Sequence, residues 1–221
     1  MDEALRRAWT EIVTPDDYEE HMARIGQAQA GADLTRHLIE TSRPPFGARI
    51  LFAGAGTGQM LDFLDASVLR PFRLVFTDLS TSFLERLKRR LRQLELTAEV
   101  IEDDFENTAL QPGPDLLIAT LLLEHIDWHR GVDTISALRP AACGIIIQEN
   151  PPEMKSAITP GRVLPRSIAE ASSQAHPVLV PYDELVPAFG ACGYEMTDTA
   201  SREVADGKRL IAVLFQEKLR P

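Results

Sequence analysis

The sequence predicts an α/β fold in which a mostly parallel sheet is covered on both faces by helices. From residue 48 onward, short runs that are apolar along their whole length alternate with segments of helical periodicity. A glycine-rich turn follows the first of these runs, and an Asp-Gly pair, which is typical of hairpins, lies between the last two. Residues 1–47 show helical patterns only, so we expect an N-terminal helical cap before a core of residues 48–221.

The cap is expected to contain at least two helices. Apolar side chains at helical spacing predict the first one over residues 5–13. Thr14 followed by Pro15 predicts the start of the second, because a hydroxyl caps free backbone amides and proline suits the first helical position. The pattern is interrupted near Gly26 and ends at residues 43–45, where Arg-Pro-Pro cannot continue a helix.

The core is expected to alternate strands and helices up to its fifth strand. This order predicts a parallel sheet that is buried on both faces. The expected strands are residues 50–53, 73–77, 99–101, 116–121 and 144–148, and the expected helices lie near residues 60–64, 80–94 and 128–138.

Residues 151–182 interrupt this alternation and contain six of the 15 prolines of the chain. A segment of this length and composition inside a compact domain is typical of a functional loop, so we expect a lid with a short helix near residues 167–173. The chain should then close with a helix and an antiparallel strand pair. These elements are expected at residues 183–191, 194–204 and 209–215.

The composition excludes several classes of function. The chain has 23 Lys and Arg against 33 Asp and Glu, a formal net charge of −10, which repels phosphate backbones and argues against a nucleic-acid partner. The longest apolar stretch, residues 116–123, is far shorter than the roughly 20 residues of a membrane-spanning helix. The N-terminus has no apolar run of the signal-peptide type, so we expect a cytoplasmic protein.

A glycine loop follows the first strand at residues 54–58, with the spacing G-x-G-x-G. Glycines there let the backbone turn sharply and approach a ligand, and the helix after them directs free amides at it. The spacing differs from the G-x-G-x-x-G of nicotinamide-binding folds, and the lysine of a phosphate-binding loop is absent. The alternative is a turn that only joins strand to helix.

Two acids follow the next two strands. Asp78 can accept both hydroxyls of a ribose, and Asp104 with Phe105 can contact an adenine edge and ring. Each acid alone is better explained as a solvated loop residue or a helix cap. Together with the glycine loop they occupy the carboxyl ends of three strands, where ligands bind in open α/β sheets.

In these features the sequence resembles the class I S-adenosylmethionine-dependent methyltransferases that act on small molecules. The resemblance implies a Rossmann-like three-layer sandwich with a seven-stranded sheet, whose last strand inserts antiparallel between strands five and six. It rests on residues 50–58, 75–78, 102–105 and 115–126 and on the terminal hairpin.

The resemblance also implies S-adenosylmethionine as cofactor and S-adenosylhomocysteine as product. The glycine loop would hold the methionine part, Asp78 the ribose, and Asp104 with Phe105 the adenine. The residues expected at the cofactor are Ala53, Gly54, Ala55, Gly56, Thr57, Gly58, Asp78, Leu79, Asp104, Phe105, Thr120 and Leu121.

Glu124 and His125 follow strand four, where related small-molecule enzymes often carry a polar pair beside the methyl group. His125 is the candidate general base, and Glu124 would orient it or the substrate. A structural histidine is the alternative, and alignment of nucleophile and methyl group can suffice without a base.

The acceptor is expected between the N-terminal helices and the proline-rich segment. Two arginines four residues apart in that segment could clamp a carboxylate, although exposed solubilising charges are the favoured explanation. Aromatic residues near the N-terminus could equally be packing residues. The candidate substrate-binding residues are Trp9, Tyr18, His21, Glu149, Asn150, Arg162 and Arg166.

No set of side chains has metal-ligand spacing, so we expect no metal. Basic residues between Arg86 and Arg92 lie on one predicted helix without aromatic residues among them, which indicates a solvated helix face.

The sequence therefore predicts methyl transfer from S-adenosylmethionine to an oxygen, nitrogen or carbon of a small molecule. The alternative is a non-catalytic domain that keeps the fold and binds the cofactor or a protein. Phe52 favours this alternative, because the family usually has an acid two residues before the first glycine. A nicotinamide-dependent reductase is disfavoured by the glycine spacing and the terminal hairpin.

Overall fold

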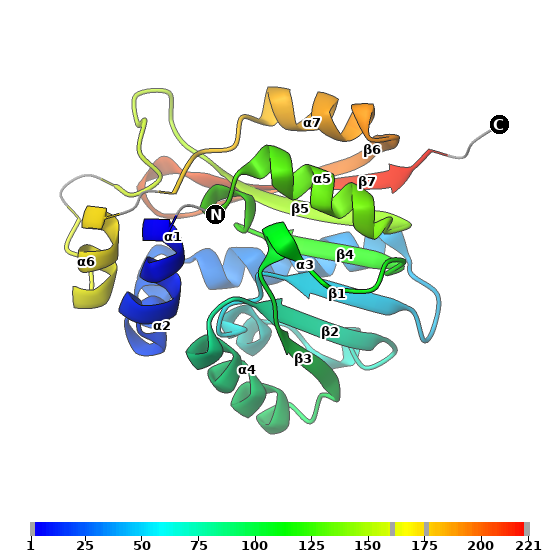
Figure 1. Ribbon diagram of the computed structural model, residues 1–221, viewed down its shortest axis with the longest axis horizontal. Coiled ribbons are helices and arrows are strands. Elements are labelled where there is room, and N and C mark those ends of the chain that lie inside the picture. The colour runs from blue at the N-terminus through cyan, green and yellow to red at the C-terminus, as the bar shows by residue number, and fades with distance from the viewer. Residues whose placement is uncertain (1–2, 160–161, 175–176, 219–221) are drawn as a thin grey trace.

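The computed structural model describes residues 3–159, 162–174 and 177–218. Its centre is a seven-stranded sheet with the order β3-β2-β1-β4-β5-β7-β6 (Figure 1). The first five strands pair in parallel, and β7 pairs antiparallel with both β5 and β6. This confirms the expected fold class. The strands are β1 (Arg49–Ala53), β2 (Arg73–Asp78), β3 (Ala98–Glu102), β4 (Leu116–Thr120), β5 (Ala142–Glu149), β6 (Tyr194–Glu203) and β7 (Arg209–Glu217).

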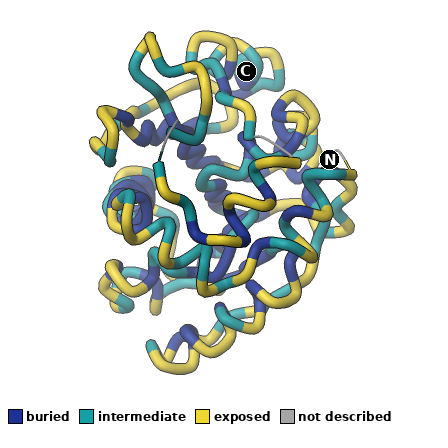
Figure 2. The backbone as a smooth tube through the Cα atoms, turned by 90° about the vertical axis from the view of Figure 1, so that its left-hand side faces the viewer, coloured by how far each residue is buried: buried dark blue, intermediate teal, exposed yellow. Residues whose placement is uncertain are grey.

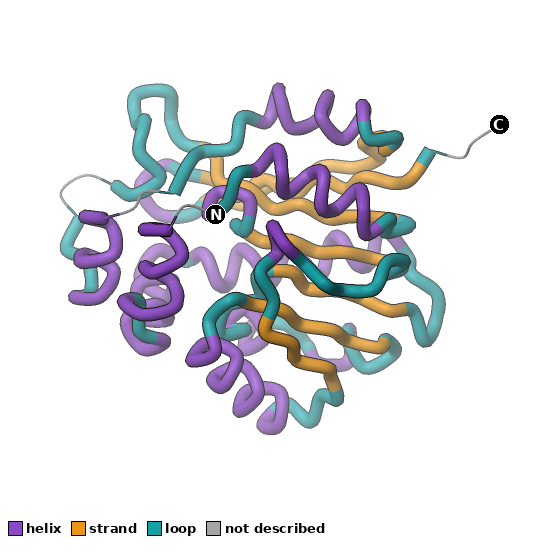
Figure 3. Tube along the Cα trace, viewed as in Figure 1, coloured by secondary structure: helices purple, strands orange, loops and turns teal. Residues whose placement is uncertain are grey.

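Helices cover both faces of the sheet, with α3 and α4 on one face and α5 and α7 on the other (Figure 3). None of the helices in the described residues is both long and apolar enough to cross a membrane. The α-helices are α1 (Glu3–Arg7), α2 (Pro15–Ile25), α3 (Gln27–Ser42), α4 (Thr81–Gln93), α5 (Trp128–Leu138), α6 (Arg166–Gln174) and α7 (Tyr182–Ala191); the short helical turns are η1 (Ala8–Ile12), η2 (Gln59–Phe63), η3 (Ala66–Val68), η4 (Phe105–Asn107), η5 (Leu123–His125) and η6 (Ala205–Gly207).

The central strands are buried along nearly their whole length, as their apolar sequences predicted (Figure 2). Alternate side chains of β1 enter opposite cores. Ile50 and Phe52 pack with residues of α3 and α4, whereas Leu51 and Ala53 pack with residues of α5 and α7. A two-sided core of this kind holds the carboxyl ends of β1 to β4 in fixed register at one edge of the sheet.

The cap lies at that edge and consists of α1, η1 and α2 together with α6 (Figure 1). Two reciprocal hydrogen bonds join its segments: the amide of Thr14 donates to Oγ of Ser167 at 3.1 Å, and the amide of Ser167 donates to Oδ2 of Asp17 at 2.7 Å. Each segment therefore satisfies the free helix-end groups of the other.

Helix α3 lies within the expected cap of residues 1–47 but contacts the sheet. Its Leu34 and Leu38 belong to the main core. The chain changes direction at Gly26, which adopts a left-handed conformation at φ 74°. In the described N-terminal segment, the cap therefore extends only over residues 3–25.

The helix expected after the glycine loop is also absent. The chain forms only the five-residue turn η2, because Leu64 is extended and the side chain of Asp65 caps a new turn at the amide of Ser67. A helix dipole therefore contributes little at the glycine loop, and the loop needs other support.

That support comes from the basic run on α4, which is not a purely solvated face. Arg90 is 9% exposed and donates to the carbonyl oxygen of Thr57 at 2.5 Å, to Oε1 of Glu19 at 3.0 Å and to Oδ1 of Asp62 at 2.8 Å. Arg86 donates to Oε2 of Glu19 at 2.9 Å. These bonds tie the glycine loop, η2 and α2 to one helix.

We expect Arg90→Met to lower the free energy of unfolding by about 1–3 kcal/mol, because it leaves the carbonyl oxygen of Thr57 and the carboxylate of Asp62 without their donor, while Glu19 keeps Arg86. Arg89→Met, at an exposed position of the same helix, should change it by less than about 0.5 kcal/mol. Urea denaturation followed by circular dichroism measures both. Equal stability of the two variants would show that Arg90 does not hold these segments together.

Candidate functional site

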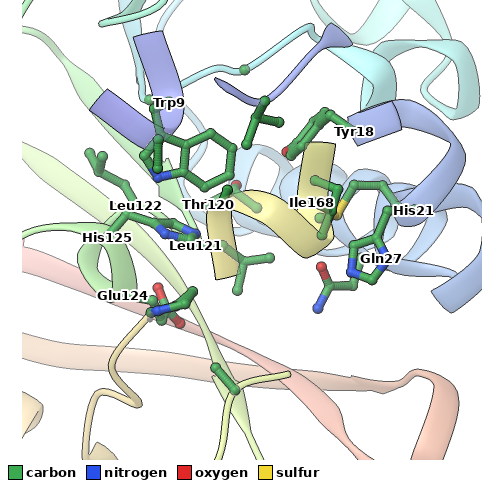
Figure 4. Close-up of a pocket in the computed structure, with 18 of the residues that line it drawn as sticks. Trp9, Tyr18, His21, Gln27, Thr120, Leu121, Leu122, Glu124, His125 and Ile168 are labelled. Atoms are coloured by element: carbon green, nitrogen blue, oxygen red, sulfur yellow. The ribbon is translucent and has the colours of Figure 1, made fainter. Parts of the chain in front are cut away.

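Two adjacent pockets lie between the carboxyl ends of the parallel strands and the cap, with volumes of about 190 Å³ and 70 Å³. They share lining residues on α2, the glycine loop and the end of β4. In Figure 4, Trp9, Glu124 and His125 lie on one side of the larger pocket, and Tyr18 and His21 lie on the other. The pockets therefore occupy the edge of the sheet where the sequence predicted a ligand.

The glycine loop is held to the end of β2 by Asp78. Oδ2 of Asp78 accepts the amide of Gly56 at 2.8 Å, and Oδ1 accepts the amide of Ser80 at 2.9 Å. Gly54 and Gly56 have φ values of 62° and 58°, a region that favours glycine. A Cβ atom on Gly56 would lie 3.4 Å from the hydroxyl of Tyr18, so the loop passes directly beneath α2.

Asp78 retains capacity for a ligand. Each carboxylate oxygen accepts one backbone amide and has a second lone pair. Burial raises the pKa of the carboxyl, and the backbone amides of Ser80, Gly56 and Leu79 oppose this rise. Asp78 and Leu79 both line the larger pocket, where a pair of hydroxyl groups can donate to the carboxylate.

At the end of β3 the structure places Asp103, not Asp104, in the pocket lining. Oδ2 of Asp103 is buried and has no hydrogen-bond partner among the described residues, and burial raises the pKa of its carboxyl. Asp104 instead accepts the amide of Glu106 and forms an ion pair with Arg6 of α1. Asp103, and not the expected Asp104, therefore lies beside Phe105 in the pocket lining.

The end of β4 supplies the floor between the two pockets. Thr120 and Leu121 line both pockets, and Oγ1 of Thr120 has no hydrogen-bond partner among the described residues. Leu121 has φ 55°, a costly conformation for this residue type, and its amide donates to the carbonyl oxygen of Ile146 at 2.8 Å. Backbone strain of this kind concentrates at functional sites.

The smaller pocket carries no charged side chain among its lining residues. Phe52 stands at its base and stacks on Phe76, with ring centroids 4.6 Å apart. Its polar lining is neutral, and Oε1 of Gln59 and Oγ1 of Thr57 are buried without partners in the described chain. Ala53, Ala55 and Gly58 complete the wall next to the glycine loop.

Glu124 and His125 both face the larger pocket (Figure 4). Oε1 of Glu124 accepts the amide of Gln148 at 2.8 Å, whereas Oε2 has no partner in the described residues. Burial raises the pKa of Glu124 to about 7 and lowers that of His125 to about 4. Near neutral pH, Glu124 is therefore the better proton acceptor, and His125 is an uncharged ring.

The roof of the larger pocket is aromatic. Trp9 packs edge-on against His125 at 4.7 Å, Tyr18 at 6.0 Å and Phe83 at 6.0 Å between ring centroids. Its indole Nε1 is buried with no hydrogen-bond partner in the part of the chain that the structure describes. Ile168 of α6 completes this wall (Figure 4).

Of the remaining residues predicted to bind the substrate, some line the larger pocket and others lie outside it. His21 and Arg162 line the larger pocket, but Arg166 is exposed at the start of α6, so the two arginines form no clamp. Glu149 pairs with Arg209, outside the lining. Asn150 donates to the carbonyl oxygens of Met154 and Ser156 and so shapes the loop after β5 instead of facing the pocket.

The sequence analysis did not identify three buried polar residues of the pocket lining, Gln27, Gln148 and Lys208. Gln27 donates to Oε1 of Gln148 at 2.8 Å, and Lys208 donates to the carbonyl oxygen of Ala157 at 2.6 Å. All three side chains are buried polar groups beside one pocket. No sequence motif marks them, although Lys208 directly follows the Asp-Gly hairpin signal. No group of three or more potential metal ligands was found in the described residues.

Residues 50–140 match a family model described as a methyltransferase domain. Magnesium protoporphyrin IX methyltransferase from Synechocystis PCC 6803, solved with bound SAH, is similar in structure with a TM-score of 0.68 and 11% identity, over 98% of this chain and 93% of that chain. An S-adenosylmethionine-dependent methyltransferase from Clostridium acetobutylicum ATCC 824 gives 0.60 and 13%, over 85% and 91%.

The [4+2]-cyclase SpnF is also similar, with a TM-score of 0.64 and 12% identity, over 86% of this chain and 81% of that chain. No curated protein sequence matches the chain. At these identities the structural likeness shows the fold. Together with the match to a methyltransferase domain, this fold confirms the resemblance to class I S-adenosylmethionine-dependent methyltransferases, and the same fold also carries other chemistry.

We expect Glu124→Gln to change how stability depends on pH. The pKa of Glu124 rises from 4.5 to about 7 on folding, so the folded chain keeps a proton that the unfolded chain releases between these values. The free energy of unfolding therefore falls as pH rises through this window, and the glutamine variant lacks that fall of roughly 2–4 kcal/mol.

Urea denaturation of both proteins at about pH 5 and about pH 8 measures the difference. Glu153→Gln, at an exposed position, is the matched control and should follow the unmodified chain. Parallel pH profiles for all three proteins would contradict the raised pKa.

Proposed function

We propose that this chain transfers the methyl group of S-adenosylmethionine to a small molecule. The observation that carries the proposal is a group of buried polar atoms without hydrogen-bond partners in the described chain, which surround one pocket at the carboxyl ends of the strands: Trp9 Nε1, Asp103 Oδ2, Thr120 Oγ1, Glu124 Oε2 and His125 Nδ1. Buried polar groups are costly unless they are paired, so such a cluster indicates a ligand.

The residues present fit an adenosine-containing cofactor. Asp78 offers two free lone pairs for ribose hydroxyls, Asp103 offers a free oxygen for an exocyclic amino group, and Phe105 offers an apolar surface. The neutral polar groups of the smaller pocket suit the amino-acid end, whose ammonium and carboxylate cancel in net charge. When bound, S-adenosylmethionine supplies an electrophilic methyl group on a sulfonium.

In this proposal Glu124 holds or takes the proton of the acceptor. Its free Oε2 faces the pocket and its pKa of about 7 suits a general base near neutral pH. His125 stays neutral and orients the acceptor through its unpartnered ring nitrogen, Nδ1. The two roles are thus reversed relative to the sequence-based hypothesis.

The aromatic roof makes this a site for a small acceptor with an apolar body. Trp9 and Tyr18 cover it from the N-terminal segment, and Ile168 covers it from α6. Displacement of water by these side chains favours alignment of a nucleophile with the methyl group.

The alternative is a domain that binds the cofactor without methyl transfer. Phe52 favours it, because its buried stack with Phe76 replaces the acid usual in the family. Incubation of the chain with a metabolite extract and methyl-labelled S-adenosylmethionine, followed by mass spectrometry, separates the two functions. Tight cofactor binding without any labelled product would favour the alternative.

We expect Asp78→Asn and Asp103→Asn each to weaken S-adenosylhomocysteine binding roughly 10- to 100-fold, because each removes a charge-assisted hydrogen bond worth about 1.5–3 kcal/mol. Asp104→Asn should have a much smaller effect, since Asp104 pairs with Arg6 outside the pocket. Calorimetric titration measures all three, with Asp133→Asn on an exposed part of α5 as control. No binding to the unmodified chain would refute the proposed function.

We expect Trp9→Ala to reduce methyl transfer by tenfold or more while leaving S-adenosylhomocysteine affinity within about threefold, because it opens the roof and spares the glycine loop. Arg7→Ala, at an exposed position of α1, is the matched control. Turnover of the labelled acceptor and calorimetry give the two readouts. Unchanged turnover would remove Trp9 from the acceptor site.

A further inference from the structure

One end of the larger pocket carries a buried cation. Lys208 precedes β7, is 7% exposed and lines the pocket. Its Nζ donates to the carbonyl oxygen of Ala157 at 2.6 Å, which uses one of three N–H donors. In the described chain no carboxylate lies within ion-pair distance of Nζ. A buried ammonium without a counter-charge is costly, so the site favours an anion.

The nearby acid, Asp206, is already engaged. Arg162 donates through Nη2 to Oδ1 at 2.7 Å and through Nε to Oδ2 at 3.1 Å, and the hydroxyl of Thr159 donates to Oδ2 at 2.6 Å. Arg162 is accordingly the main cause of the lowered pKa of the Asp206 carboxyl. Asp206 also attracts Lys208 from farther away, but Arg162 and Lys208 together carry one more charge than Asp206 balances, so this end of the pocket has an excess of one positive charge.

His21 of α2 lines the same pocket and lies close enough to Lys208 and Arg162 to be affected by their charges, so it adds a donor near them. No hydrogen bond to its ring is found in the described residues. Burial, and then the positive charges of Arg162 and Lys208, lower the pKa of its imidazole. The ring is therefore neutral near neutral pH and has one N–H to donate.

The acceptor's polar group can thus lie apart from its nucleophile. In Figure 4, His21 and Gln27 lie on the opposite side of the pocket from Glu124 and His125. Between these two ends lie apolar side chains, including Leu121 and Ile168. The pocket therefore has a cationic end, an apolar middle and an end with a proton acceptor.

We infer that the methyl acceptor is an organic acid whose carboxylate is bound by Lys208 and His21, and whose apolar body places the nucleophile near Glu124. This inference rests on the proposed function and names the substrate class for it. A monoanion matches the single uncompensated charge, whereas a phosphate would bring a second charge with no cation left to balance it.

The test is calorimetric titration of the chain saturated with S-adenosylhomocysteine. Benzoate and octanoate are the acid probes, and benzamide and octanamide are their neutral counterparts. We expect at least one acid to bind tenfold or more tightly than its amide, and Lys208→Met to remove that preference. Lys155→Met, at an exposed position of the loop after β5, should retain it.

A second readout guards against misfolding of the Lys208 variant. In the unmodified chain, acids should shift the ring ¹H–¹⁵N resonances of His21 and amides should not. Equal binding of acids and amides, no binding of any acid, or an undiminished preference in Lys208→Met would overturn the inference. In each of these cases, intact S-adenosylhomocysteine binding would leave the proposed function standing.

Discussion

The glycine loop and the cap both depend on the buried guanidinium of Arg90. A buried cation must be paired, and its partners come from three separate segments: the carbonyl of Thr57, the carboxylate of Asp62 and the carboxylate of Glu19. No α-helix follows the glycine loop, so its backbone is held instead by the hydrogen bond from Arg90 to the carbonyl oxygen of Thr57. One side chain of α4 thereby holds both the glycine loop and helix α2 of the cap.

The succession of strands and helices along the chain and the terminal hairpin could be predicted from sequence, because each depends on a local signal. The place of β7 between β5 and β6 was expected only from the family resemblance. Fully apolar runs specify a parallel sheet with two covered faces, and Asp206-Gly207 marks the closing turn. The boundary of the cap could not be found in this way. Helix α3 has the same periodicity as α2, and only packing decides that it belongs to the core.

In the candidate site, too, some residues could be predicted from the sequence and others could not. Asp78 follows its strand without ambiguity, whereas two adjacent acids follow β3, and only backbone geometry brings Asp103 into the pocket in place of Asp104. The basic end of the pocket depends on contacts between distant segments, so sequence spacing favoured Arg166 and gave no sign of Lys208. Burial also raises the pKa of Glu124 above that of His125, the reverse of their usual order. This reversal could not be predicted from a sequence pattern.

The stacked pair Phe52 and Phe76 has a consequence for the ligand-free protein. A carboxylate at this depth would be an uncompensated buried charge whenever no ammonium group occupied the pocket, and folding would then be coupled to occupancy. The aromatic ring removes that penalty and forgoes one electrostatic contact with the ligand. The fold of this chain therefore does not depend on a ligand to neutralise a buried charge at the base of the smaller pocket.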